Sequence, residues 1–340
     1  MEERQNRINS VDLFRAFGIL VMIMGHVGFG GLFHKWSHAF HMPMFFFISG
    51  WFYKQEASLQ GRLLRKAKGL LVPYLLIGAA EFLCLIPFFE EYRGWKFFYS
   101  WLVENTDPIS VELGARAYSP VPGAMWFLTS LFLCEAVYAI LDRAAGDSFL
   151  LHILVLGGAV FGMMGRTVFS FRFPWALDAG LVGMGFYHIA RVWKKTGSYR
   201  LLELKVWQSL LAGVFFSILI IFSPWINMRR GGYGIYPLFV CNAMGAIAAG
   251  WNLSRHFGEF CSRNRLLSWF SSYLSDIGRN SIVYLCLNQI VIMGIDILLA
   301  GTGIGFEQSK IVCLILTMGV LFLLEKGICN TRLRFLVGRF

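Results

Sequence analysis

The stretch from Asp12 to Gly50 reads DLFRAFGILVMIMGHVGFGGLFHKWSHAFHMPMFFFISG, and it decides how the rest of the chain is interpreted. Two apolar helical runs in it carry an aspartate, an arginine and several histidines. Arg15 and His26 are eleven residues apart, close to a whole number of helical turns. Both side chains therefore leave one face, about 16 Å apart along the axis. A charged or titratable side chain at membrane depth normally faces protein or water, which makes each a candidate functional group.

Arg15 and His26 also have purely structural explanations. Arg15 could extend to the lipid headgroups, or pair with Asp12 three residues earlier on nearly the same face. His26 could be an interior histidine whose hydrogen bonds are satisfied by the protein. A functional role is favoured because His41 and Ser49 interrupt the following phenylalanine-rich run, at a depth where polar groups are costly.

Three pieces of this stretch occur together: Asp12-Leu-Phe-Arg15-Ala, ten residues between Arg15 and His26, and the segment FHMPMFFFISG. In combination they resemble the integral-membrane acyltransferase 3 family, most closely the branch that acetylates sugars of surface polysaccharides. The resemblance implies that His26 is the catalytic residue and that Asp12 and Arg15 belong to the same motif. It covers nearly the whole chain and is strongest over residues 8–74.

The composition independently predicts a membrane protein. The chain of 340 residues is 56% hydrophobic, 16% aromatic and 15% charged, and its mean hydropathy is +0.58. Soluble domains of this length do not have such a composition. The net charge of +11 does not indicate a nucleic-acid partner, because the basic residues lie in short loops between apolar runs, which is how membrane topology is encoded. The expected surroundings are a lipid bilayer.

Many apolar runs are long enough to cross a bilayer. We predict an all-α membrane protein, a polytopic bundle of about ten transmembrane helices that form a single domain over residues 1–340. If the N-terminus is cytoplasmic, the segments on the inner side of the membrane hold more Lys and Arg than the outer segments, as the positive-inside rule requires. An even number of spans then places both termini in the cytoplasm, which is the predicted topology. The predicted spans are Val11–Phe29, Ser37–Phe52, Gly69–Phe89, Ala124–Leu141, Phe149–Gly165, Pro174–Trp193, Val206–Phe222, Gly234–Trp251, Ser281–Ala300 and Ile311–Leu324.

The most basic predicted cytoplasmic loop runs from Lys54 to Lys68 and contains Arg62-Leu-Leu-Arg65-Lys66, followed by Pro73 at the opening of the third span. Its cations could be a topological anchor. They could also hold phosphate groups, because guanidinium groups offer paired donors to phosphate oxygens. The resemblance implies a role for this loop in handling the acyl-CoA donor, so Arg62, Arg65 and Lys66 are candidate donor-binding residues. The two interpretations are compatible.

Other polar or aromatic residues in the spans are candidates for lining an acceptor site. His41 and Ser49 lie in the second span, and Ser49 could donate a hydrogen bond to a developing oxyanion. Trp126 could stack on a sugar, although tryptophans are also common at membrane interfaces. Asp178 is the best candidate for a second acidic group. Asn288 stands where many members of the family have a histidine, and it can hydrogen-bond but cannot titrate.

No metal site or tightly bound cofactor is predicted. His34, His38 and His41 are close in sequence but have no nearby cysteine or carboxylate, and their spacing matches no standard zinc set. His34 and His38 are expected at the outer surface in contact with solvent. The outer segment Glu90–Gly123 begins with aromatic residues that suit an interfacial helix.

Two functions remain open. The first is a membrane O-acyltransferase in the cytoplasmic (inner) membrane of a bacterium, which moves an acetyl or other acyl group from cytoplasmic acyl-CoA (acetyl-CoA) to a cell-surface carbohydrate, with His26 as general base. The alternative is a multi-pass transporter or flippase for a small molecule or glycan precursor, which would use the same polar residues as a path. Transporters often show internal repeats. The sequence shows no correspondence between its halves, so the enzyme is favoured.

Overall fold

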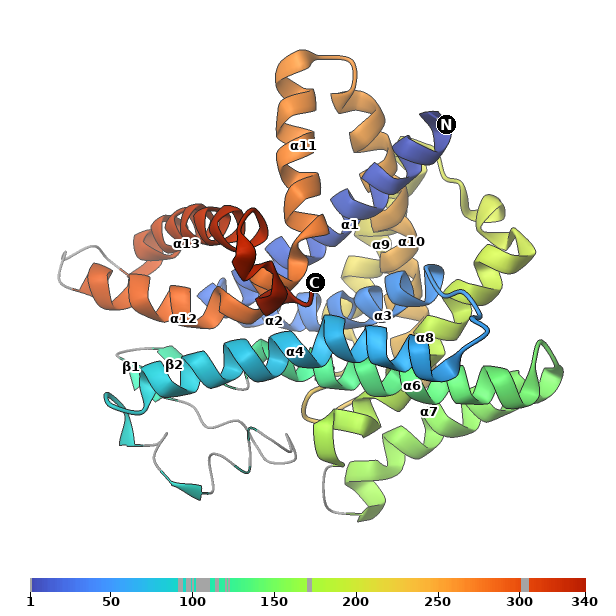
Figure 1. Cartoon of the computed structure of the whole chain (residues 1–340). Coiled ribbons are helices and arrows are strands. Elements are labelled where there is room, and N and C mark those ends of the chain that lie inside the picture. Colours follow the sequence, from blue (N-terminus) through green and yellow to red (C-terminus); the bar gives the residue numbers. More distant parts are fainter. Residues whose placement is uncertain are drawn as a thin grey trace.

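The protein is described here by a computed structural model that covers residues 2–90, 94, 95, 99, 101, 111–113, 116–119, 121, 123–169, 173–300 and 306–340. Nearly all of the regular structure in these residues is helical (Figure 1). The helices are α1 (Glu2–Val27), α2 (Gly31–His38), α3 (His41–Trp51), α4 (Leu59–Leu85), α6 (Trp126–Ala145), α7 (Phe149–Phe169), α8 (Leu177–Thr196), α9 (Val206–Phe222), α10 (Tyr236–Cys261), α11 (Arg265–Arg279), α12 (Ser281–Ala300) and α13 (Phe306–Cys329). Short 3₁₀ turns are η2 (Gly123–Met125), η3 (Pro174–Ala176), η4 (Ser198–Leu202) and η5 (Arg332–Val337).

Five helical segments of the described chain are long and apolar enough to cross a membrane: Ser10–Val27, Leu59–Leu85, Gly123–Ala145, Ser281–Ala300 and Ser309–Cys329. Phe149–Gly165 and Val206–Phe222 are shorter apolar helices. The predicted class, a helical membrane protein, is therefore supported. Each predicted span overlaps a helix, but the full number of spans and the orientation of the termini stay predictions.

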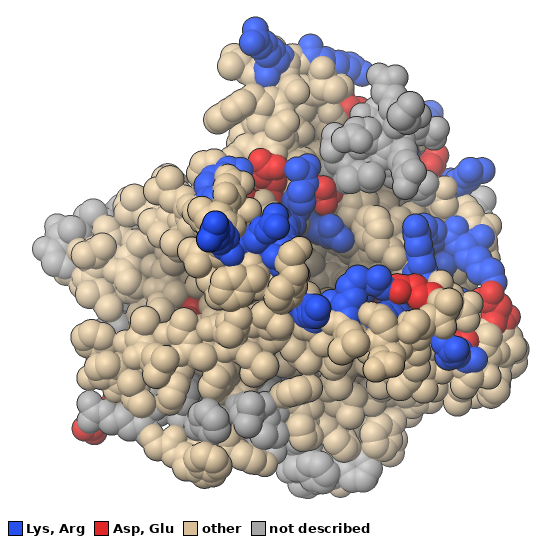
Figure 2. All heavy atoms as spheres, viewed as in Figure 1, with Lys and Arg blue, Asp and Glu red and all other residues tan. Residues whose placement is uncertain are grey.

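Charge is distributed unevenly over the surface. Figure 2 shows Lys and Arg gathered around α11, the start of α4 and the C-terminus, whereas the surface over α12, α13 and the far end of α4 is almost free of charge. A low charge density is what lipid contact requires. The basic end is the one that the positive-inside rule predicts to face the cytoplasm.

Helix α1 packs against α3, α10, α11 and α12 and is central to the bundle (Figure 1). Two glycines allow close helix contacts near it. A β-carbon at Gly278 of α11 would overlap the backbone carbonyl of Asp12, and one at Gly50 of α3 would overlap the carbonyl of Tyr187 in α8. At these positions the helix backbones touch, so any larger residue would force the helices apart.

The structure corrects three details of the sequence prediction. The basic segment is not a loop throughout, because α4 begins at Leu59, where the Ser58 side chain caps it by accepting the Gly61 N–H at 3.0 Å. Pro73 lies inside α4 and does not open it. The predicted single span Ser37–Phe52 is divided into α2 and α3.

The amphipathic helix α11 was not predicted. Its serines lie on one side, while Leu266 and Trp269 on its apolar side are 79% and 71% exposed. Tyr273 on the same helix contacts Phe322 of α13, with ring centroids 5.1 Å apart. The apolar side of α11 therefore continues the apolar surface of α13, which is typical of a helix at a membrane interface.

The predicted outer segment Glu90–Gly123 falls largely outside the described residues, and so does most of its predicted interfacial helix. The described residues of this segment include two short antiparallel strands, β1 (Val111–Leu113) and β2 (Arg116–Tyr118). The backbone N–H of Ser119, just after β2, donates to the side chain of Gln289 at 3.2 Å. This end of the strand pair is thus held against α12.

Candidate functional site

His26, near the carboxyl end of α1, forms a hydrogen bond with Asn288 of α12. The distance from His26 Nδ1 to Asn288 Oδ1 is 2.6 Å. The amide nitrogen of Asn288 is occupied, because it donates to the backbone carbonyls of Tyr284 at 3.0 Å and Leu285 at 2.7 Å. Two donated bonds fix the orientation of the amide, so its oxygen is the atom that faces the histidine.

This arrangement defines the tautomer of the neutral His26 ring. An amide oxygen can only accept, so His26 Nδ1 carries the hydrogen and donates it to Asn288. The lone pair is then on Nε2, the atom that a general base uses to remove a proton. Asn288 is fully buried, whereas His26 is half-buried. The rigid amide therefore orients a ring that keeps some access to its surroundings.

Three further histidines lie near His26. His34, His38 and His41 are each close enough to interact with it electrostatically. Consecutive rings are in contact, with centroids 3.9 Å apart for His34 and His38 and 5.1 Å apart for His38 and His41. His41 Nδ1 donates to the carbonyl of Ser37 at 2.6 Å.

His34 and His38 are both half-buried, so they are less exposed than the sequence predicts. The reason is that α2 folds back beside α1, and the ring of Trp225 lies 5.3 Å from that of His34. Among the described residues, no group of three or more His, Cys, Asp or Glu side chains is arranged to hold a metal ion.

Arg15 and Asp12 lie toward the other end of α1. Arg15 Nη1 is 3.2 Å from Asp12 Oδ1, as the structural alternative predicted, and Asp12 also faces Arg279 of α11 at 3.7 Å. The Arg15 guanidinium lies over the Phe52 ring, 5.2 Å from its centroid. Arg15 and His26 share a helix but are not in contact, since about 16 Å of axis separates them.

The predicted donor-binding cations are paired with carboxylates. Arg62 is buried, and its Nη2 lies 3.3 Å from Glu135. Lys66 reaches the same carboxylate at 2.8 Å. The exposed Arg65 pairs with Glu56 and lowers the pKa of that carboxyl below its usual value. These ion pairs give the segment a structural role, and donor binding by it stays a prediction.

Predicted residues of the acceptor site are placed at different levels of the bundle. Ser49 lies eight residues after His41 on α3, about 12 Å further along the axis, so the structure does not support it as an oxyanion donor beside His26. Asp178 is buried against α7, where its β-carbon faces Gly165. Trp126 is buried at the start of α6, directly after η2, which packs against α12.

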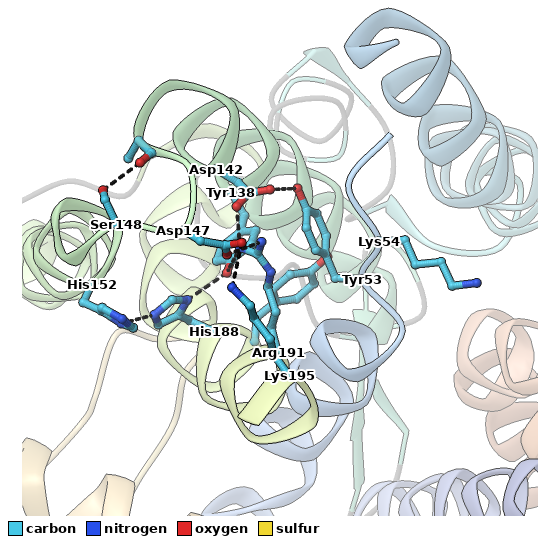
Figure 3. A network of polar contacts seen from close by, with 12 residues as sticks. Tyr53, Lys54, Tyr138, Asp142, Asp147, Ser148, His152, His188, Arg191 and Lys195 are labelled. Carbon is cyan, nitrogen blue, oxygen red and sulfur yellow. Dashed lines mark hydrogen bonds and ion pairs between the residues drawn. The ribbon is translucent and has the colours of Figure 1, made fainter. Parts of the chain in front are cut away.

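Sequence reasoning missed a polar network between α6, α7 and α8 (Figure 3). Arg191 bonds to Asp142 and, at 3.0 Å, to the Tyr138 hydroxyl. The same hydroxyl lies 2.8 Å from His188 Nδ1, and His188 Nε2 lies 2.7 Å from His152 Nδ1. In the sequence, these residues appear only as single polar residues within apolar runs. Their partners lie on other helices, so the sequence alone does not indicate the network. The network links three helices.

A known protein family matches nearly the whole chain. Residues 8–325 match the acyltransferase domain that defines the acyltransferase 3 family. The chain belongs to the acyltransferase 3 family. It is therefore a membrane acyltransferase, and the resemblance seen in the motif of α1 is confirmed over nearly the whole chain. No curated protein and no solved structure matches the chain.

Proposed function

We propose that this family member is an O-acyltransferase of the bacterial cytoplasmic (inner) membrane. It moves an acyl group, acetyl in the simplest case, from cytoplasmic acyl-CoA to a hydroxyl of a cell-surface carbohydrate or its precursor. The observation that carries the proposal is the bond between His26 and Asn288, because it leaves Nε2 of His26 as an unprotonated base. A base of this kind is what the attack of a hydroxyl on a thioester needs.

The chemical step follows from that tautomer. His26 Nε2 removes the proton of the acceptor hydroxyl while the hydroxyl oxygen attacks the thioester carbonyl carbon. The new C–O bond forms, the C–S bond breaks, and the CoA thiolate takes the proton from the imidazolium. Asn288 keeps its hydrogen bond to Nδ1 throughout, so the positive charge on the ring is stabilised without reorientation.

The proposal is tested by mass spectrometry of cell-surface glycans from a strain that lacks the protein, complemented with wild type or with His26→Ala. We expect wild type to restore an acyl-sized mass on one glycan and His26→Ala to leave it absent at equal expression. Glycans that are identical in all strains would exclude the proposed reaction. Restoration of the acyl group by His26→Ala would exclude this base.

A further inference from the structure

A cavity of about 950 Å³ lies apart from the His26–Asn288 pair, at the basic end of the bundle. It is lined by residues of α1, α3, α8, η4, α10 and α11. Cavities of this size accommodate ligands as large as a cofactor. Ser10, at the start of the apolar part of α1, is in its wall, so the cavity adjoins the same helix that carries His26.

Aromatic rings form one side of the cavity. Trp51 is buried and contacts Trp251 and Tyr199, with ring centroids 4.9 Å and 5.2 Å apart, while Trp193 is packed on Phe47 at 5.7 Å. These contacts hold the rings in place. Trp193, Tyr199 and Trp251 are only half-buried. Fixed, accessible aromatic faces of this kind stack on the bases of nucleotides.

Two arginines of the cavity hold their carboxylate partners only loosely. Arg255 lies 3.5 Å from Glu203 and 3.9 Å from Glu259, and its buried Nε has no hydrogen-bond partner among the described residues. Arg279 lies 3.4 Å from Asp276 and 3.7 Å from Asp12. Direct charge-assisted hydrogen bonds are shorter, about 2.7–2.9 Å. Both guanidinium groups therefore retain donors for an anion.

The basic start of α4 differs from the cavity in how its cations are held. There, Lys66 is 2.8 Å from Glu135, and the guanidinium of Arg62 is buried between protein acceptors. In the cavity, the side chains of Glu203 and Glu259 are 50% and 59% exposed, so they can turn into solvent when a stronger anion arrives. The Arg62 side chain is only 5% exposed, whereas those of Arg255 and Arg279 are 31% and 54% exposed, so a phosphate would reach donors more readily at Arg255 and Arg279 than at Arg62.

The remaining wall is polar and comes from α11. Ser268, Ser271, Ser272 and Ser275 line the cavity, and Asn252 of α10 faces it as well. Hydroxyl and amide groups suit the ribose and phosphate oxygens of a nucleotide. The opposite side of α11 is apolar and exposed, as described above. The helix thus separates a polar cavity from the surface expected to contact lipid.

We infer that this cavity binds the nucleotide end of the acyl-CoA donor, with the adenine on the indole rings and the phosphates on Arg255 and Arg279. The inference rests on the proposed function for the identity of the donor. Ser10 and His26 are sixteen residues apart on α1, about 24 Å along its axis. The nucleotide therefore stays at the basic end, and the extended pantetheine arm carries the thioester toward His26.

The experiment is equilibrium binding of CoA to the purified full-length protein by titration calorimetry. Arg255→Gln and Arg279→Gln each remove a guanidinium group from the cavity, and we expect each to weaken binding by about tenfold, as loss of a hydrogen bond to a charged group implies. Arg265→Gln is the matched control. It removes an exposed arginine at the start of α11 that does not line the cavity, and it should bind CoA like wild type.

Each outcome has a separate meaning when all variants are equally monodisperse. Wild-type affinity in both Arg255→Gln and Arg279→Gln would overturn the inference and leave the proposed function intact. Loss of affinity in Arg65→Gln, with Arg255→Gln unaffected, would move the nucleotide to the start of α4. Absence of CoA binding by the wild type would overturn both the inference and the proposed donor.

Discussion

His26 and Asn288, which are 262 positions apart in the chain, meet across α1 and α12 with 2.6 Å between Nδ1 and Oδ1. Because both amide hydrogens of Asn288 are used on backbone carbonyls, the residue acts as a fixed acceptor. A histidine at this position would change protonation state, whereas the amide cannot. Asn288 therefore orients the imidazole ring, and His26 transfers the proton.

Replacement of His26 by alanine should abolish most acyl transfer. Loss of a general base commonly reduces the rate by about 10²–10⁴-fold. The measurement is turnover by purified protein whose expression and detergent monodispersity match those of wild type. His256→Ala is the control, since His256 lies on α10 and bonds to the Leu204 carbonyl at 2.9 Å. Near-normal turnover of His26→Ala would rule out the proposed chemical step.

Asn288→Ala should reduce kcat more than it changes KM. The His26 Nδ1–H would lose its acceptor and the ring its fixed orientation, at a cost of about 1.4–2.8 kcal/mol, which is tenfold to a hundredfold in rate. Asn288→Asp keeps an acceptor oxygen but loses the two bonds that the amide donates to the Tyr284 and Leu285 carbonyls, so it should recover only part of kcat. A merely structural role predicts instead that both variants lose stability in parallel with activity, and thermal unfolding in detergent separates the two cases.

The sequence predicts the helices wherever a run is continuously apolar. The bounds of α9 and α12 coincide with the predicted Val206–Phe222 and Ser281–Ala300. The sequence predicts a loop at the start of α4 because the segment is rich in charges whose partners are distant in the sequence. In the structure Arg62 and Lys66 pair with Glu135 on α6. Helix α11 was missed because its apolar residues alternate with serines and do not form a continuous run.

The candidate site was predictable only where its residues share one helix. Arg15 and His26 follow from helical spacing along α1. The partner of His26 does not, because Asn288 reaches it through the packing of two helices that are distant in sequence. The cavity is a product of tertiary structure in the same way, since Trp51 of α3, Trp251 of α10 and Arg279 of α11 come from separate parts of the chain.

Arg62→Ala should destabilise the protein by about 3 kcal/mol, because it leaves the buried Glu135 with one cation fewer and opens a gap beside Tyr53. Arg65→Ala is the matched comparison. Its side chain is 62% exposed, and exposed ion pairs contribute at most about 1 kcal/mol. Thermal unfolding in detergent should show a clear decrease for Arg62→Ala and little change for Arg65→Ala. Equal stabilities would mean that the Arg62–Glu135 pair is not structural.

The predicted orientation can be tested by single cysteines in a background without the native ones. Gln60, exposed at the start of α4, should be protected from an impermeant thiol reagent in intact cells, because the Lys and Arg excess places it in the cytoplasm. Asp107, in the predicted outer segment, should be labelled. Permeabilised cells should label both cysteines. Labelling of position 60 but not of position 107 in intact cells would reverse the topology.

Gly278→Ala should separate α1 from α11 at the basic end of the bundle, beside the proposed nucleotide cavity. The added methyl would overlap the backbone carbonyl of Asp12, and backbone cannot turn aside as a side chain can. Overpacking of this kind costs about 1–3 kcal/mol. The matched control is Gly294→Ala in α12, where no atom of the neighbouring described residues lies within 4 Å of the added carbon. That variant should be as stable as wild type or more stable by up to about 1 kcal/mol, since alanine favours helix more than glycine.

Gly278→Ala should also weaken CoA binding, because α11 carries the serine wall of the cavity and Arg279 follows directly after the glycine. If Gly278→Ala unfolds at the same temperature as Gly294→Ala and binds CoA equally well, the close contact of α1 and α11 is not what maintains the cavity.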